Sequence, residues 1–97
     1  MSAKDDWPFS DPKNLAVITI DRIVDGRKPI LYVSHDADDG GWQLLDGGSV
    51  SETDARIVSL LSMVERDPTL LELADLPHGW AAERDGVDKP WRRIRSE

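Results

Sequence analysis

Residues 15–34 read LAVITIDRIVDGRKPILYVS, and this stretch decides the expected fold. Its first ten residues are rich in β-branched side chains, which favour a strand. Residues 29–34 have the same character, and Asp25-Gly26 lies between the two runs. Because glycine accepts a positive φ without steric cost, this dipeptide is typical of a tight turn. The stretch therefore predicts an antiparallel hairpin that pairs strand 15–24 with strand 29–34.

The first of these strands is apolar on both faces. Successive side chains of a strand point to opposite sides of the sheet. Two apolar faces are typical of a strand in the middle of a sheet rather than at its edge. One face is expected to carry Ala16, Ile18 and Ile20, and the other Leu15, Val17 and Ile23.

Two more strands and a short helix are expected further along the chain. Residues 35–41 (HDADDGG) have the composition of a loop, and residues 42–45 (WQLL) follow as a third strand. Residues 69–74 (TLLELA) predict a short helix opened by Pro68, because proline is favoured at the first helical position. Residues 80–84 (WAAER) predict a last short strand.

The main helix is expected to begin at Ser51. Asp54 stands three residues later, and the serine hydroxyl would cap a free backbone N–H at the helix start. The helix should end before Asp67-Pro68, since a residue that precedes proline avoids the α-helical region. A break near Ser59 is an alternative. Helical spacing predicts that its buried side consists of Ile57, Leu60, Leu61 and Val64.

These elements predict an α+β fold with a small, mostly antiparallel sheet of three to four strands and one or two helices packed on one face. Ninety-seven residues fit one domain. The domain is expected to span residues 15–88, between a loose N-terminal leader at 1–14 and a C-terminal tail at 89–97. Trp7 and Phe9 are expected to anchor the leader, because large aromatic side chains gain most from burial.

The composition excludes several classes of protein. The chain has no cysteine, which excludes disulfides, thiolate catalysis and cysteine-ligated metal sites. No apolar run approaches the roughly 18 residues that a membrane span requires. We therefore expect a cytoplasmic protein, with no membrane partner, that is a monomer or a weak dimer.

Negative charge is concentrated in the middle of the chain. The formal net charge is -7, and residues 35–55 hold six acids and no Lys or Arg. Nucleic acid is excluded as a partner, because phosphate binding requires clustered cations. An acidic surface speeds encounter with a basic protein, whereas the alternative is that it only maintains solubility. The residues predicted to bind a basic protein partner are Asp36, Asp38, Asp39 and Asp46.

The sequence predicts no catalytic residue, no cofactor and no metal ligand. Alternate aspartates in the loop 36–41 would offer hard oxygens to calcium. The helix–loop–helix calcium signature, however, requires glutamate at position twelve, and Gly47 stands there when Asp36 is counted as the first position. A solvated hairpin loop is therefore favoured. His35 and His78 have neither an evident nucleophile nor a metal-ligand spacing. We expect a protein that is not an enzyme.

A small-ligand or enzymatic pocket is the alternative to protein binding. Its expected lining is Trp42, Trp80, His35 and Arg84. Arg84 would either hold a carboxylate ligand through two hydrogen bonds or form a structural ion pair. The favoured position of Trp42 and Trp80 is the core, and exposure as interaction hot spots is the other interpretation.

Two stretches resemble a known family. Residues 39–47 (DGGWQLLDG) are similar to a segment of the form D-x-G-W-x-F-x-x-G. Asp67-Pro68, Leu70-Leu71 and residues 76–84 (LPHGWAAER) are similar to a segment with D-P, leucines and P-x-G followed by arginine. Together they resemble small bacterial domains of unknown function that are grouped with immunity proteins of polymorphic toxin systems. The resemblance covers roughly residues 15–88. It implies binding of a toxin-like protein and no reaction.

Overall fold

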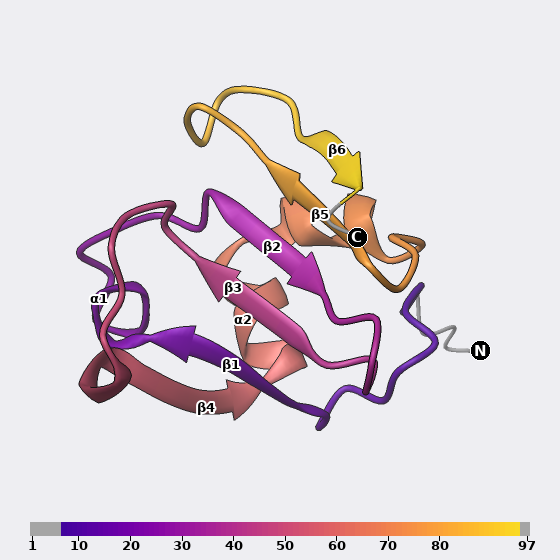
Figure 1. Ribbon diagram of the computed structural model, residues 1–97, viewed down its shortest axis with the longest axis horizontal. Coiled ribbons are helices and arrows are strands. Elements are labelled where there is room, and N and C mark those ends of the chain that lie inside the picture. Colours follow the sequence, from indigo (N-terminus) through magenta and orange to yellow (C-terminus); the bar gives the residue numbers. More distant parts are fainter. Residues whose placement is uncertain (1–6, 96–97) are drawn as a thin grey trace.

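The computed structural model describes residues 7–95, which form a six-stranded mixed sheet with its helices on one side (Figure 1). The strand order across the sheet is β4-β1-β3-β2-β5-β6. The elements along the chain are β1 (Ala16–Ile20), α1 (Asp21–Val24), β2 (Tyr32–His35), β3 (Trp42–Leu45), η1 (Glu52–Asp54), β4 (Ala55–Ser59), α2 (Leu60–Arg66), η2 (Pro68–Leu73), β5 (Trp80–Glu83) and β6 (Arg92–Arg95).

Strand β1 occupies an inner position between two strands that follow it in the chain. It runs parallel to β3, with Ile18 opposite Gln43, and antiparallel to β4, with Ile18 opposite Ile57. The pairs β2–β3, β2–β5 and β5–β6 are all antiparallel. The prediction of an inner first strand is therefore confirmed.

The core lies between the sheet and the helices α2 and η2, which cover its back in Figure 1. Leu60 and Met63 of α2 are almost wholly buried, and so are Leu70 and Leu73 of η2. Phe9 joins this cluster and meets the indole of Trp42 edge-on, with 5.5 Å between ring centroids. The predicted anchoring of the N-terminal segment by Phe9 is confirmed.

The predicted hairpin of strands 15–24 and 29–34 is wrong. Strand β1 stops at Ile20, a helical turn follows, and β3 lies between β1 and β2. Gly26 has the positive φ expected of it, 81°, but it ends α1 instead of forming a hairpin turn. The N–H of Gly26 donates to the carbonyl of Ile23 and that of Arg27 to the carbonyl of Arg22. These two bonds are those of a Schellman helix end, which needs glycine as much as a tight turn does.

The predicted helix from Ser51 is also wrong in its first half. Ser51 and Asp54 do form the expected capping box, but it closes only the single turn of η1. The chain then extends as β4, and α2 starts at Leu60 after Ser59, whose hydroxyl accepts a hydrogen bond from Ser62 N–H at 3.1 Å. The alternative break near Ser59 is the outcome. β-Branched residues in 55–59 favour a strand there. Pairing with β1 then stabilises the strand over the helix.

The predicted fold class must be corrected accordingly. The sheet has six strands instead of three to four, its pairing is mixed, and it contains less helix than expected. One added strand, β4, replaces half of the predicted helix. The other, β6, lies within residues 89–97 and pairs with β5. The strands predicted at 42–45 and 80–84, the short helix after Asp67 and the end of α2 before Pro68 are confirmed.

The helices found in residues 7–95 are short. None of them has the length and apolar character needed to cross a membrane.

Candidate functional site

A small hollow of about 100 Å³ lies where the β2–β3 loop meets the open face of the sheet. We call it the acidic hollow. It combines carboxylates from the loop with an apolar side chain from β1. Its lining consists of Ile18, Asp36, Asp39, Gly41, Trp42 and Gln43.

Local hydrogen bonds fix the loop that carries the carboxylates. Asp36 Oδ1 accepts from the N–H of Asp38, and Asp39 Oδ1 accepts from the N–H of Gly41, both at 2.8 Å. Backbone bonds between Asp36 and the Gly40-Gly41 pair close the turn. Each of the two carboxylates therefore keeps its second oxygen, Oδ2, for another partner, and Asp38 in the same loop is exposed.

The negative charge of this loop is not neutralised by basic side chains. Asp36, Asp38 and Asp39 are exposed. Within residues 7–95, none of the three forms an ion pair with a lysine or arginine. The structure thus brings together three of the four predicted partner-binding residues, and it leaves their charge available.

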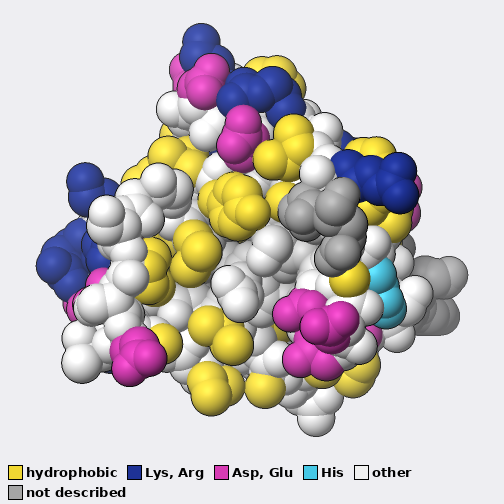
Figure 2. Space-filling model, in the orientation of Figure 1, with side chains coloured by type: hydrophobic (Ala, Val, Ile, Leu, Met, Phe, Trp, Pro, Cys, Tyr) yellow, Lys and Arg dark blue, Asp and Glu magenta, His cyan; other side chains and the backbone are white. Residues whose placement is uncertain are grey.

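The sheet face next to the loop is open and partly apolar. Figure 2 looks onto this face and shows apolar side chains spread across it, with acidic side chains at the lower right, where Figure 1 places the β2–β3 loop. Ile18 of β1 is 42% exposed, and its neighbour Ile57 on β4 is 74% exposed. Exposed apolar side chains beside charged ones are typical of protein-binding surfaces when they are contiguous.

Aromatic stacking supports the loop from beneath. The ring of His35 stacks on the indole of Trp42, with 3.8 Å between centroids and 15° between planes. His35 Nδ1 lies 2.7 Å from the carbonyl oxygen of Leu76, and His78 meets the His35 ring edge-on at 4.4 Å. Trp42 Nε1 donates to Asp11 Oδ2 at 2.9 Å. Trp42 is thus a buried support of the site, which agrees with its predicted place in the core.

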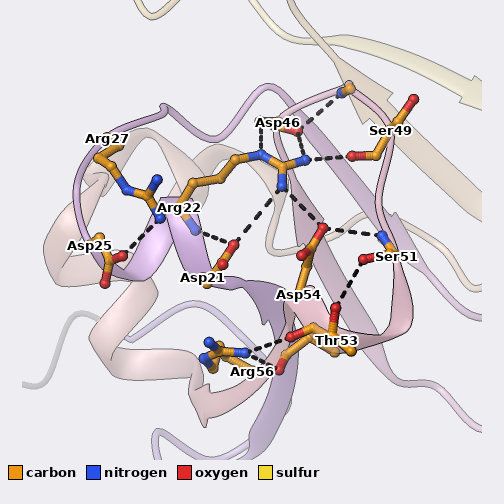
Figure 3. A network of polar contacts seen from close by, with 12 residues as sticks. Asp21, Arg22, Asp25, Arg27, Asp46, Ser49, Ser51, Thr53, Asp54 and Arg56 are labelled. Carbon is orange, nitrogen blue, oxygen red and sulfur yellow. Dashed lines mark hydrogen bonds and ion pairs between the residues drawn. The ribbon is translucent and has the colours of Figure 1, made fainter.

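Asp46 belongs to a different part of the molecule. It follows β3, whereas the loop 36–41 precedes it, so the two lie roughly 15 Å apart along the strand. Arg22 Nε donates to Asp46 Oδ2 at 2.7 Å, and Arg22 Nη2 donates to the carbonyl of Ser49 at 2.6 Å (Figure 3). Arg22 Nη1 also reaches Asp54 Oδ2 at 3.2 Å. Asp46 is therefore one member of an ion-paired cluster, and the structure does not group it with the other three carboxylates.

The cluster around Arg22 keeps its carboxylates ionised. The hydrogen bond from Arg22 lowers the pKa of Asp46, and the N–H of Gly48 lowers it further. The pKa of Asp54 is lowered first by the N–H of Ser51 and then by Arg22. Both carboxylates hold the segment between β3 and β4 against α1, which carries Arg22.

The alternative pocket lined by Trp42, Trp80, His35 and Arg84 is not assembled. His35 and Trp42 are paired with each other at one end of β2, and Trp80 is opposite His35. Arg84 pairs with Leu31, at the other end of that strand. It is buried and donates to the Ile30 carbonyl, to Thr69 and to Asp67, with the Trp91 ring 4.2 Å from its guanidinium carbon. Of the two roles predicted for Arg84, the structure therefore has the structural ion pair, with Asp67 as the partner.

Sequence reasoning missed the exposure of Ile18 and Ile57. Ile18 was placed on an apolar face of an inner strand, and Ile57 on the buried side of a helix. The adjacent β-branched residues Ile57 and Val58 were the available signal, because such residues favour a strand. Among residues 7–95, no group of three or more histidine and carboxylate side chains is placed to hold a metal ion.

Comparison with known proteins gives no relative from which a function follows. No protein-family model, no curated protein and no solved structure matches the chain.

Proposed function

We propose that the protein is a non-enzymatic binding module of the cytoplasm that docks a basic protein on the acidic hollow and the adjoining open sheet face. The supporting observation is the exposed trio Asp36, Asp38 and Asp39, which carries no balancing cation within residues 7–95. The resemblance to immunity proteins makes a toxin-like partner the first to test.

The hollow suits a lysine or arginine side chain of the partner. The aliphatic stem would lie on Ile18, and the cationic head would reach the carboxylates of Asp36 and Asp39. Ile57 continues the apolar surface beside Ile18, so that the partner covers both. Charge complementarity of this kind speeds association more than it strengthens the complex. Asp46 takes no part, because Arg22 occupies its carboxylate.

The experiment compares isosteric neutral variants. Asp36→Asn and Asp39→Asn together keep an oxygen acceptor for the loop N–H groups, so the loop fold is retained while two charges are lost. The matched control is Glu52→Gln with Glu65→Gln, two exposed carboxylates outside the hollow. Host proteins are captured at low salt, the partner is identified, and its association rate with each purified variant is measured.

The proposal expects capture of a basic protein whose association slows about three- to tenfold with the loop variant and stays unchanged with the control. Ile18→Ser should speed its dissociation. Equal slowing by both double variants, or a partner that binds without regard to salt, contradicts the proposal.

A further inference from the structure

A second hollow lies at the opposite end of β2 and has the opposite charge. It has a volume of about 330 Å³, and we call it the basic hollow. The segment between α1 and β2 provides most of it, and the end of α2 and the β5–β6 loop complete it. Its lining consists of Gly26, Arg27, Lys28, Pro29, Ile30, Arg66, Asp67 and Val87. In Figure 2, dark blue side chains mark the side of the molecule where Figure 1 places the α1–β2 segment.

The cations of the basic hollow exceed the carboxylates around it. Arg27 is paired with Asp25 at 2.9 Å, and Asp67 is engaged by Arg84. Within residues 7–95, Lys28 and Arg66 form no ion pair with a carboxylate. Two positive charges thus remain unbalanced at one place on a chain whose net charge is -7.

One of these cations is held in position. Arg66 Nη2 donates to the carbonyl of Val24 at 2.8 Å, across 42 residues of sequence. Gly26 lies beside this guanidinium, since a Cβ built on Gly26 would be 3.6 Å from Arg66 Nη1, an ordinary van der Waals contact. An arginine fixed at one nitrogen offers its remaining donors to an oxyanion at reduced entropic cost. Pro29 and Val87, the latter 62% exposed, add an apolar wall.

We propose that the basic hollow binds the oxyanion group of a small organic ligand, a phosphate or a carboxylate, between Lys28 and Arg66. The volume falls at the lower end of the roughly 300–1,000 Å³ typical of small-molecule sites. Two unbalanced cations match a doubly charged oxyanion, and the apolar wall would contact the carbon skeleton that carries it. This site is separate from the acidic hollow, since the loops before and after β2 carry the two sites.

The test is a titration of the 97-residue chain followed by backbone amide NMR, with inorganic phosphate in one arm and succinate in the other. Ionic strength is held constant with sodium chloride. The expected result is saturable shifts of the amide signals of residues 25–28, 30, 66–67 and 87 in at least one arm, and the arm that responds identifies the oxyanion. Absence of saturable shifts in both arms overturns the proposal.

Variants assign the binding to the named residues. Lys28→Gln with Arg66→Gln should weaken binding about tenfold, because charge-assisted hydrogen bonds are lost. The matched control, Arg56→Gln with Arg95→Gln, removes two exposed cations elsewhere and should leave the affinity unchanged. Equal weakening by both pairs means a general charge effect and overturns the proposal. Lys28→Gln alone disturbs no described hydrogen bond, so its expected threefold loss, about the effect of one exposed charge, can be measured even where Arg66→Gln unfolds the chain.

Discussion

The ring of His35 lies flat against the indole of Trp42, 3.8 Å away, and the acidic loop begins at the very next residue. His35 is 8% exposed and Trp42 is 3% exposed, so the stack belongs to the core. It joins the ends of β2 and β3 directly beneath the carboxylates of the acidic hollow. The geometry of the loop therefore depends on an aromatic pair that is itself buried.

His35→Ala is expected to destabilise the protein by about 2 kcal/mol, because it removes a stacked partner and leaves a cavity. Urea denaturation followed by tryptophan fluorescence measures the change. The exposed Glu65 on α2 provides the control, since its replacement by alanine should change stability by no more than about 0.5 kcal/mol. Equal effects of the two substitutions would show that the stack carries no stability.

Arg84→Met should destabilise the chain by about 3 kcal/mol, since it leaves Asp67 Oδ2 without its cationic partner and the Ile30 carbonyl without its side-chain donor. Thermal unfolding followed by circular dichroism measures the loss. Arg56→Met is the comparison, because Arg56 is exposed and donates only to nearby backbone carbonyls of its own segment. A loss at Arg84 no larger than that at Arg56 would contradict a structural role for the buried guanidinium.

Gly26→Ala should cost about 1 kcal/mol, because alanine is strained at the φ of 81° that ends α1. The space around Gly26 accepts a methyl group, so the cost comes from the backbone alone. Gly48→Ala is the control at a glycine without a positive φ, where an added Cβ makes only ordinary contacts. The measurement is the urea concentration at which each variant is half unfolded. An unchanged midpoint for Gly26→Ala would count against the helix-end assignment.

Stability should fall in acid through the Arg22 cluster. Folding lowers the pKa of Asp46 and of Asp54, so each contributes stability that is fully present above its unfolded pKa, about 4. That contribution is lost as the pH falls below this value and through the lowered pKa of the folded state. Unfolding free energies of the wild type and of Arg22→Gln should therefore differ at pH 7 and converge toward pH 3.

The control for this prediction is Arg95→Gln, which removes an exposed cation from β6. Its difference from the wild type should be small and should not change in the same way with pH. A gap between wild type and Arg22→Gln that stays constant from pH 7 to pH 3 would show that Arg22 acts without its carboxylate partners.

The residue types within short segments predicted most of the strands, but they did not predict which strands pair with each other. β-Branched and aromatic runs identified β1, β2, β3 and β5, since strand propensity acts over a few residues. The choice of partner depends on contacts between segments far apart in sequence, and Asp25-Gly26 serves a helix end as well as it serves a hairpin. Strand β4 was missed because residues 55–59 fit both states. Strand β6, with the sequence RRIR, has a single apolar side chain to mark it.

In the candidate sites, too, residues that are close in sequence were predictable as neighbours, whereas contacts between distant segments were not. Asp36, Asp38 and Asp39 lie within four residues of each other, so their proximity was predictable. Strand β3 separates Asp46 from that group, and the pairing of its charge depends on Arg22, which is 24 residues away. In the basic hollow, the sequence shows Arg27-Lys28 as a pair of cations, but the proximity of Arg66 depends on the tertiary contact between Arg66 and the Val24 carbonyl, 42 residues away.

The inner position of β1 has a consequence for synthesis on the ribosome. This strand emerges early, yet its neighbours β3 and β4 are complete only at Leu45 and Ser59. Until then, two edges of an apolar strand have no native partner in the nascent chain. The pairing of β1 with β4 must therefore wait for the second half of the polypeptide, and contacts so distant in sequence make folding slow. A chaperone that shields residues 16–20 during translation would act at the moment when the protein is most prone to aggregate.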